Sequence, residues 1–268
     1  MRKPSRLSSV CASARRVAVI PDTQVRPGVP LDHLDWGAEA LLYYRPDVVV
    51  HLGDHWDMGS LSSYEKAGGL KLEGARIKDD IDAGNDAFVR LFGPMQKEVK
   101  RQDRCKLKNR WTPECHYLFG NHENRINRAV AGDAKYEGVL TTDALLTPGF
   151  KRHGFLEIVE IDGVHYSHYF SNTHSGKPIG GSIDNRLNKI GHSFVAGHEQ
   201  GLLYGCRQYP GTTTRHGLVA GSFYMHDEEY RGPQANDEWR GIVILNEVKD
   251  GSYDLMTLSL DYLQRRFS

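Results

Sequence analysis

The first fifty residues contain two short apolar runs separated by a helical pattern. Residues 16–20 (RVAVI) and 47–52 (DVVVHL) are almost wholly apolar, which is typical of buried strands. Pro46 ends the helical pattern, whose apolar positions are Leu31, Leu34, Ala38, Leu41 and Leu42. A strand, a helix and a strand in this order predict a βαβ unit with parallel strands and a right-handed crossover.

The later part of the chain predicts strands and hairpins. Residues 116–119 (HYLF) are a third apolar run, and residues 155–170 predict a hairpin that turns at Asp162 and Gly163. Further strands are expected at residues 193–196, at residues 216–224, and in a final hairpin that turns at Asp250 and Gly251. Alternating strands and helices followed by hairpins favour a layered α/β fold.

Two segments interrupt this pattern. Residues 1–15 are basic and rich in serine, and we expect them to form a mobile arm ahead of a single domain at residues 16–268. Residues 58–115 are polar and predict an insert that packs beside or over the functional site. Within the insert, a helix is expected at about residues 76–92, ending at Gly93 and Pro94.

Composition narrows the class of protein. The chain has 268 residues, 34 basic and 34 acidic side chains, so no net charge attracts it to nucleic acid or an anionic membrane. No run approaches the ~18 apolar residues of a membrane span. We therefore expect a protein that binds no membrane. The four cysteines lack CxxC spacing, which indicates reduced thiols and a cytoplasmic protein. Cys105, Cys115 and His116 together suggest a zinc site as an alternative.

Potential metal ligands follow five of the apolar runs. These blocks are AVIPDTQ, VVVHLGDHWD, HYLFGNHEN, VHYSHYF and FVAGHEQ. Each block alone has a simpler explanation as a cap, a turn or a core histidine. Because ligands at the carboxyl ends of parallel strands meet in one crevice, their common placement favours a shared metal site.

In this order the blocks resemble the calcineurin-like metallophosphoesterase superfamily, whose pattern is DxH, GDxxD, GNH followed by Asp or Glu, a strand histidine, and GHxH. The resemblance covers residues 17 to about 201. It implies a four-layered α/β/β/α sandwich with two mixed sheets. It also implies phosphoester hydrolysis by a hydroxide that bridges two divalent ions. The chain further resembles phage-encoded members, which implies the cytoplasm of an infected host.

The resemblance implies a ligand set for each ion. The first ion would be held by Asp22, Gln24, Asp54 and Gln200. The second would be held by Asn121, His168, His198 and the same Asp54, which bridges the two ions. His165 lies three residues before His168 and points to the other face of the strand, so only one of the two can be the ligand. His168 is favoured because it ends the run.

Two positions depart from the family's pattern, because Gln24 and Gln200 stand where histidine is usual. Both belong to the first ion, whose ligands therefore all become oxygen atoms. Hard oxygen ligands suit Mn²⁺ or Mg²⁺ better than Zn²⁺. We expect the first site to select Mn²⁺ or Mg²⁺ and to hold it more weakly. Mn²⁺ is favoured overall, with Mg²⁺, Fe or Zn²⁺ as alternatives at the second site.

Catalytic roles and substrate class also follow from the resemblance. His122 would donate to the phosphate or the leaving oxygen, with Asp57 orienting it and raising its pKa. Arg125 matches one of two arginines that grip phosphate in serine/threonine protein phosphatases, but Met58 stands at the position of the other. Arg125 and Arg128 meet either a phosphate or Glu123.

Three functions stay open. A phosphodiesterase or nuclease is favoured, with the basic arm and residues 97–110 as a local patch for nucleic acid. A phosphomonoesterase or protein phosphatase is the first alternative. A non-catalytic metal-binding scaffold is the second, because two ligands depart from the family's set.

Overall fold

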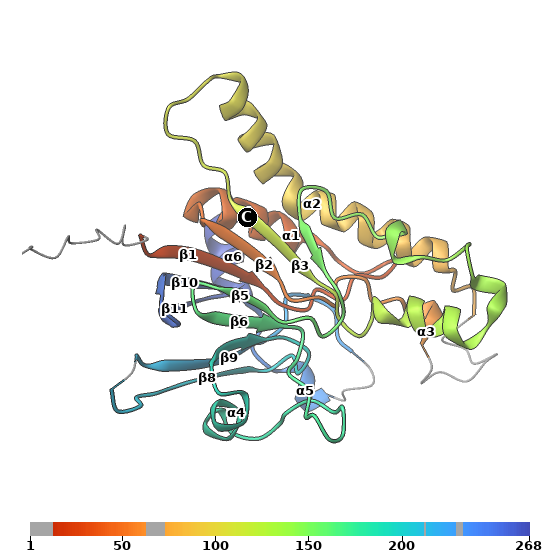
Figure 1. The fold of residues 1–268 in the computed structure, drawn as a ribbon. Coiled ribbons are helices and arrows are strands. Elements are labelled where there is room, and N and C mark those ends of the chain that lie inside the picture. The colour runs from red at the N-terminus through yellow and green to blue at the C-terminus, as the bar shows by residue number, and fades with distance from the viewer. Residues whose placement is uncertain (1–12, 63–72, 212, 229–232) are drawn as a thin grey trace, which may run out of the picture.

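Two mixed β-sheets form the centre of the computed structural model, which describes residues 13–62, 73–211, 213–228 and 233–268 (Figure 1). The six-stranded sheet has the order β11-β10-β1-β2-β3-β4. Its four parallel strands are β1 (Arg15–Ile20), β2 (Val48–His51), β3 (Glu114–Leu118) and β4 (Lys151–His153). The antiparallel strands are β10 (Gly241–Lys249) and β11 (Ser252–Ser259). Of the expected arm, residues 1–12 lie outside the described residues.

The second sheet has five strands in the order β5-β6-β7-β9-β8. Parallel pairing joins its central strands, and antiparallel pairing adds β5 and β8 at the edges. The strands are β5 (Val159–Ile161), β6 (Val164–Ser167), β7 (Ser193–Ala196), β8 (Leu202–Arg207) and β9 (Arg215–Ala220). The expected hairpin at residues 155–170 is therefore confirmed, with Gly163 at φ +82° in its turn.

Alternating side chains of β1 separate two apolar cores. Ala18 and Ile20 contact the helices on one face of the six-stranded sheet. Val17 and Val19 point to the other face, where they pack against Val164 and other side chains of the second sheet. Because successive strand residues point to opposite faces, this single apolar run serves both layers.

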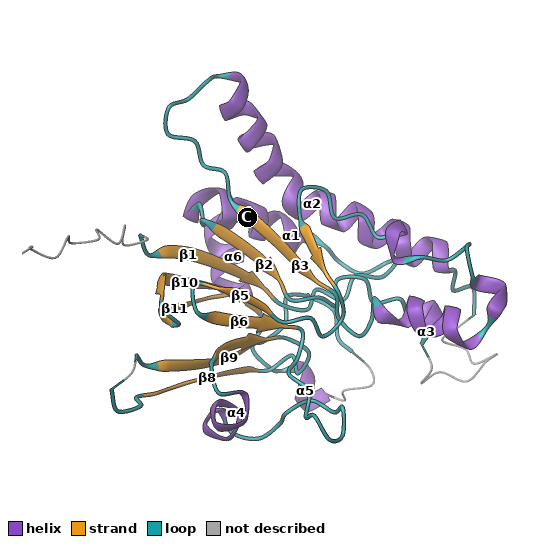
Figure 2. Cartoon of the chain, in the orientation of Figure 1, coloured by secondary structure: helices purple, strands orange, loops and turns teal. Residues whose placement is uncertain are grey.

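Helices cover the outer faces of both sheets (Figure 2). On the six-stranded sheet lie α1 (Asp32–Tyr44), α2 (Ile77–Arg104) and α6 (Leu260–Phe267). On the five-stranded sheet lies α4 (Ile183–Ile190), whose Leu187 packs on Phe194. Two further helices are α3 (Asn124–Gly132), which follows β3, and α5 (Pro233–Asn236), which precedes β10. The predicted four-layered α/β/β/α arrangement with two mixed sheets is confirmed.

Helix α2 shows that the expected end at Gly93 and Pro94 was wrong. The helix continues to Arg104, with Pro94 inside it. A proline inside a helix costs roughly 3 kcal/mol and bends the helix, and α2 is bent (Figure 1). Phe92 and Met95, on either side of this pair, are buried in the same core. Burying each side chain stabilises the fold by roughly 1.5–3 kcal/mol, which offsets the cost of the proline.

Candidate metal centre

Loops that follow five parallel strands meet at one edge of the sandwich. The backbone N–H of His122, after β3, donates to Asp54 Oδ1 after β2 at 2.9 Å. The backbone N–H of His198, after β7, donates to Asp22 Oδ1 after β1 at 3.1 Å. His168, after β6, places its Nδ1 2.8 Å from the Leu52 carbonyl oxygen. The structure thus brings the five sequence blocks together.

Backbone pairing continues beyond β1 and β2 and fixes two of these loops. The N–H groups of Thr23 and Gln24 donate to the Asp54 carbonyl at 3.2 and 2.9 Å, and the N–H of Val25 donates to His55 O at 2.7 Å. The N–H of Asp57 returns to Val25 O at 2.9 Å. Gln24 is therefore held beside Asp54 by the backbone itself.

Asp54 lies at the centre of the site. Its carboxylate, His168 and His198 each offer a ligand atom, and these three atoms lie within 4.8 Å of one another. Asp54 is 1% exposed, and its Oδ2 is 3.2 Å from His168 Nε2. Burial opposes ionisation, but the neighbouring His122 and His168 hold the pKa of Asp54 well below its ordinary value. A Cβ on Gly120 would lie 2.0 Å from Asp54 Oδ1, so only glycine fits there.

Of the two strand histidines, His168 lies in the cluster. Its ring is fully buried, and Nδ1 can donate to the Leu52 carbonyl, which leaves Nε2 toward Asp54 and Asn121 Oδ1. Although burial opposes it, Asp54 raises the pKa of His168 to about 9. His165 instead stacks on His192, with ring centroids 4.3 Å apart.

The neighbouring His198 is only partly buried, and it differs from His168 in protonation. Burial, followed by the charge of His168, lowers the pKa of His198 to about 4. Its neutral ring is the form that binds a metal ion.

Unpartnered polar atoms mark the side of the site nearest Asp22. Asp22 Oδ2 and both amide atoms of Gln24 are buried without a hydrogen-bond partner among the described residues. Burial, followed by the charge of Asp54, raises the pKa of Asp22 to about 7. Gln200 follows His198 in a loop where both residues have positive φ, and its Oε1 accepts from Tyr224 Oη at 2.8 Å. Buried polar atoms without partners fit a bound cation, because unsatisfied groups are otherwise rare.

His122 lies beside Asp54 with its ring fixed by Asp57. His122 Nδ1 is 2.8 Å from Asp57 Oδ1, so this nitrogen carries a proton and donates it. Nε2 is then 3.7 Å from Asp54 Oδ2. Burial opposes protonation, but Asp54 and the hydrogen bond to Asp57 raise the pKa of His122. A group of this kind can act as a general acid.

Arg125 and Arg26 both approach Asp57. Arg125 Nη1 donates to the carbonyl oxygens of Asp57 and Met58 at 2.8 and 3.3 Å. Arg26 Nη1 lies 3.3 Å from Asp57 Oδ2 and 2.9 Å from the buried Glu228. Met58 itself is fully buried in the core. The sequence patterns did not point to Arg26, because its position depends on the backbone pairing beyond β1.

Glu123 is a second residue whose contacts the sequence did not reveal. Its carboxylate accepts hydrogen bonds from the backbone N–H groups of Asp54, His55, Trp56 and Gly120 and from Tyr117 Oη, at 2.7–3.1 Å. The alternative in which Glu123 pairs with Arg125 is therefore not what the structure shows. Glu123 is a buried anchor for the loop that carries Asp54.

The side chain of His55, directly after Asp54, belongs to the core. Its ring is fully buried between Trp56 and Phe88. Nε2 lies 2.9 Å from the Gly84 carbonyl, and Nδ1 lies 2.6 Å from Thr23 Oγ1. Burial lowers the pKa of His55 to about 4. This neutral ring supports the loop from behind.

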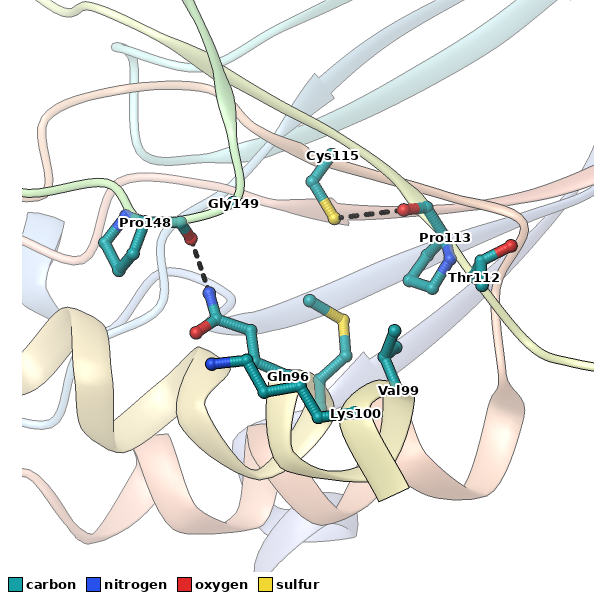
Figure 3. Close-up of a pocket in the computed structure, with 9 residues that line it drawn as sticks. Gln96, Val99, Lys100, Thr112, Pro113, Cys115, Pro148 and Gly149 are labelled. Atoms are coloured by element: carbon teal, nitrogen blue, oxygen red, sulfur yellow. Dashed lines mark hydrogen bonds between the residues drawn. The ribbon is translucent and has the colours of Figure 1, made fainter. Parts of the chain in front are cut away.

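A separate cavity of about 260 Å³ lies where α2 passes the start of β3 (Figure 3). Gln96, Lys100, Pro113 and Cys115 are among its lining residues. It adjoins the amino end of β3, whereas the ligands follow the carboxyl end. Burial raises the pKa of Cys115 to about 12, so its thiol is not a nucleophile.

No family model matches the chain, and no curated protein does. Among solved structures, a conserved uncharacterized protein from Streptococcus pneumoniae, described as a predicted phosphoesterase, matches with 11% identity and a TM-score of 0.37. The match covers 93% of this chain and 91% of that one. Among the described helices, none combines the length and apolarity needed to cross a membrane. The chain has an α/β fold with two mixed sheets and, at one edge, a cluster that could hold a metal ion.

Proposed function

We propose that this protein is a metal-dependent phosphoester hydrolase with a two-metal site, and that its substrate is a phosphodiester. The observation that carries the proposal is the convergence of ligand atoms of Asp54, His168 and His198 within 4.8 Å. Beside them, Asp22 Oδ2 and the side-chain amide of Gln24 have no hydrogen-bond partner among the described residues. Two bound divalent ions would supply positive charge to the phosphate and lower the pKa of a water molecule.

The protein's own side chains divide between the two ions in this proposal. The first ion is held by Asp22, Gln24, Asp54 and Gln200. The second is held by Asp54, Asn121, His168 and His198. The hydrogen-bonding distance between His168 Nδ1 and the Leu52 carbonyl supports its role, because ligating histidines usually donate their other nitrogen to a fixed acceptor. Mn²⁺ is the favoured metal because the first ligand set is all oxygen.

His122 is the proposed general acid. Asp57 holds its Nδ1, so Nε2 can give a proton to the leaving oxygen. Arg125 lies beside this ring, with Nη2 3.3 Å from Nε2. Its Nη1 is already engaged by two carbonyl oxygens, so we propose that Arg125 positions the loop of Asp57 and offers only its remaining edge to the phosphate.

A nuclease is one form of the diesterase proposal. The basic segment at residues 97–110 belongs to the end of α2 and the connection to β3. It therefore adjoins the amino end of β3, at the opposite end of that strand from the metal ligands. Arg101 and Arg110 in this segment pair with Glu98 and Asp103. The basic segment at residues 97–110 therefore does not support a nucleic acid substrate, and the only support is the proposed two-metal site.

A phosphomonoesterase is the second candidate because of one contact. Arg26 lies 3.3 Å from Asp57 and is partly exposed. It therefore brings a second guanidinium group next to Asp57, whereas the following residue, Met58, has no charged group. Two guanidinium groups suit the dianionic phosphate of a monoester.

Hydrolysis of two model substrates tests the function. We expect the Mn²⁺-loaded protein to hydrolyse bis-para-nitrophenyl phosphate faster than para-nitrophenyl phosphate, with a loss of about 10²–10⁴-fold in His122→Ala. His192→Ala, which removes a histidine outside the cluster, should leave the rate unchanged. A preference for the monoester that disappears in Arg26→Met would favour the phosphomonoesterase. Absence of hydrolysis with every divalent ion would leave a non-catalytic scaffold.

A further inference from the structure

A second cluster of titratable groups joins β3 to the edge strand β4, outside the proposed metal centre. His116 Nδ1 and His153 Nε2 lie 3.0 Å apart, and the rings stack with centroids 5.2 Å apart and an interplanar angle of 23°. Each residue is 3% exposed. His116 and Cys115 are adjacent on a strand and point to opposite faces, so the zinc cluster that the sequence suggested with the cysteines does not form.

A carboxylate lies at the outer nitrogen of each ring. His116 Nε2 is 2.9 Å from Glu114 Oε1, and His153 Nδ1 is 3.0 Å from Glu157 Oε1. The hydrogen bond from Arg15 lowers the pKa of Glu114, and the hydrogen bond from His153 lowers that of Glu157. Both carboxylates are therefore ionised and can only accept. Each outer nitrogen must carry the proton of its ring.

This arrangement brings the two inner nitrogens face to face at hydrogen-bonding distance, where one shared proton or one metal ion can link them. Burial lowers the pKa of His116, even though Glu114 opposes it, and Lys151 nearby lowers it further. Since each outer nitrogen carries a proton, two neutral rings would bring their lone pairs 3.0 Å apart. A cation that both nitrogens share removes this repulsion, and a metal ion can do so in place of a proton.

We propose that His116 and His153 bind a transition-metal ion through these inner nitrogens, with Glu114 and Glu157 holding the ligating rings in place. Imidazole nitrogens suit Zn²⁺, Cu²⁺ and Ni²⁺. Two nitrogens 3.0 Å apart can both lie about 2.0–2.1 Å from one ion. A carboxylate behind each ligating histidine is the usual outer partner in metal sites.

The surroundings supply both a route for the ion and a consequence of its binding. The side chains of Glu114 and Glu157 are 53% and 52% exposed, so the two rings lie directly beneath the surface. His153 ends the short edge strand β4, and the ion would link it to β3. It would also fix the turn after β4, where the Gly154 N–H donates to Glu157 Oε2 at 2.8 Å. The site is independent of the proposed hydrolase function.

Copper binding tests the proposal in the full-length protein. Cu²⁺ is the probe because it binds most tightly among the divalent ions of the first transition row. The His168→Ala variant removes one of the two histidines of the other cluster, so that no histidine pair remains there. In this background we expect one equivalent of Cu²⁺ whose electron paramagnetic resonance spectrum shows coupling to two nitrogens. Adding His153→Gln should abolish that spectrum.

Two further variants control the experiment. His216→Gln removes a histidine of similar burial that contacts Tyr204 and Ser252, and it should leave the copper spectrum unchanged. Glu157→Gln changes a half-exposed side chain, so the fold should be kept, and copper affinity should fall about 10–100-fold. Absence of the two-nitrogen spectrum in His168→Ala, or its survival in His153→Gln, would overturn the proposal. If His153→Gln fails to fold, an unchanged copper affinity in Glu157→Gln would overturn the proposal instead. None of these outcomes depends on hydrolytic activity.

Discussion

On the His168 side of the candidate metal centre the polar atoms contact one another, whereas on the Asp22 side several have no partner among the described residues. His168 Nε2 lies 3.2 Å from Asp54 Oδ2 and 2.9 Å from Asn121 Oδ1. Asp22 Oδ2 and the Gln24 amide have no such contacts. The first group is held in place by hydrogen bonds, while the second is held by the backbone pairing of its loop.

This difference indicates how each ion would act on the protein. A buried polar group without a partner costs roughly 1–3 kcal/mol, so an ion on the Asp22 side would relieve a cost already present in the fold. An ion on the His168 side would replace contacts that already exist. The two halves should therefore respond differently to substitution.

The largest effect is expected from Asp54→Asn, because Asp54 belongs to both proposed ligand sets. The amide keeps the shape but removes the charge that balances both ions. We expect hydrolysis to fall on the order of 10³-fold, because electrostatic stabilisation of the transition state usually contributes more to such catalysis than any other effect. Metal analysis of the dialysed protein should show loss of both ions.

Asp57→Asn is the matched comparison for Asp54→Asn. It should slow hydrolysis through His122 but keep both ions bound. If Asp54→Asn retained two tightly bound ions, Asp54 would not be the bridge.

The next effect separates the two strand histidines and tests the His168 side alone. His168→Ala should remove one ion and lower kcat about 10²-fold, because its ring is buried against Asp54. His165→Ala should change the rate less than about twofold, since His165 stacks on His192. Equal losses in both variants would show that the effect reflects strand stability and not metal binding.

Much of this centre follows from the sequence, because apolar runs and the residues after them determine which side chains reach the edge of the sheets. The positions of Asp22, Asp54 and His198 depend on strand ends, and strand ends were visible in the pattern. Glu123 and Arg26 were not, because their contacts depend on how separate loops pair. No local pattern encodes the backbone bonds between residues 23–25 and 54–57.

The fold shows the same division. The buried strands and α1 were predicted from hydrophobic spacing, and the turn at Asp162 and Gly163 from its residue types. Strand β8 was missed because most of its residues are exposed and show no apolar run. Helix α4 was missed although it has a serine cap at Ser182 and ends at Gly191 with φ +82°. Only eight residues lie between these two end signals, which is too few for a clear helical pattern of apolar positions.

A smaller effect is expected on the Asp22 side, where the proposed ligands Gln24 and Gln200 are both amides. The double variant Gln24→His with Gln200→His should shift the preference of the first site from Mn²⁺ toward Zn²⁺ or Fe by about tenfold, because nitrogen ligands suit these metals. Each single variant should shift it less. The ratio of bound metals after dialysis against an equimolar mixture measures the shift. An unchanged ratio in the double variant would mean that these side chains do not contact the first ion.

The smallest effect is expected from Tyr224→Phe, which removes the hydroxyl that donates to Gln200 Oε1 at 2.8 Å. Loss of such an outer contact lowers metal affinity about tenfold, at the weak end of the usual range, because the amide can still turn toward the ion. The ring is fully buried, and phenylalanine keeps its packing, so stability should change by only about 1 kcal/mol. Isothermal titration with Mn²⁺ should therefore show weaker binding of one ion and unchanged binding of the other. A loss at both ions would contradict the division of the centre into two halves.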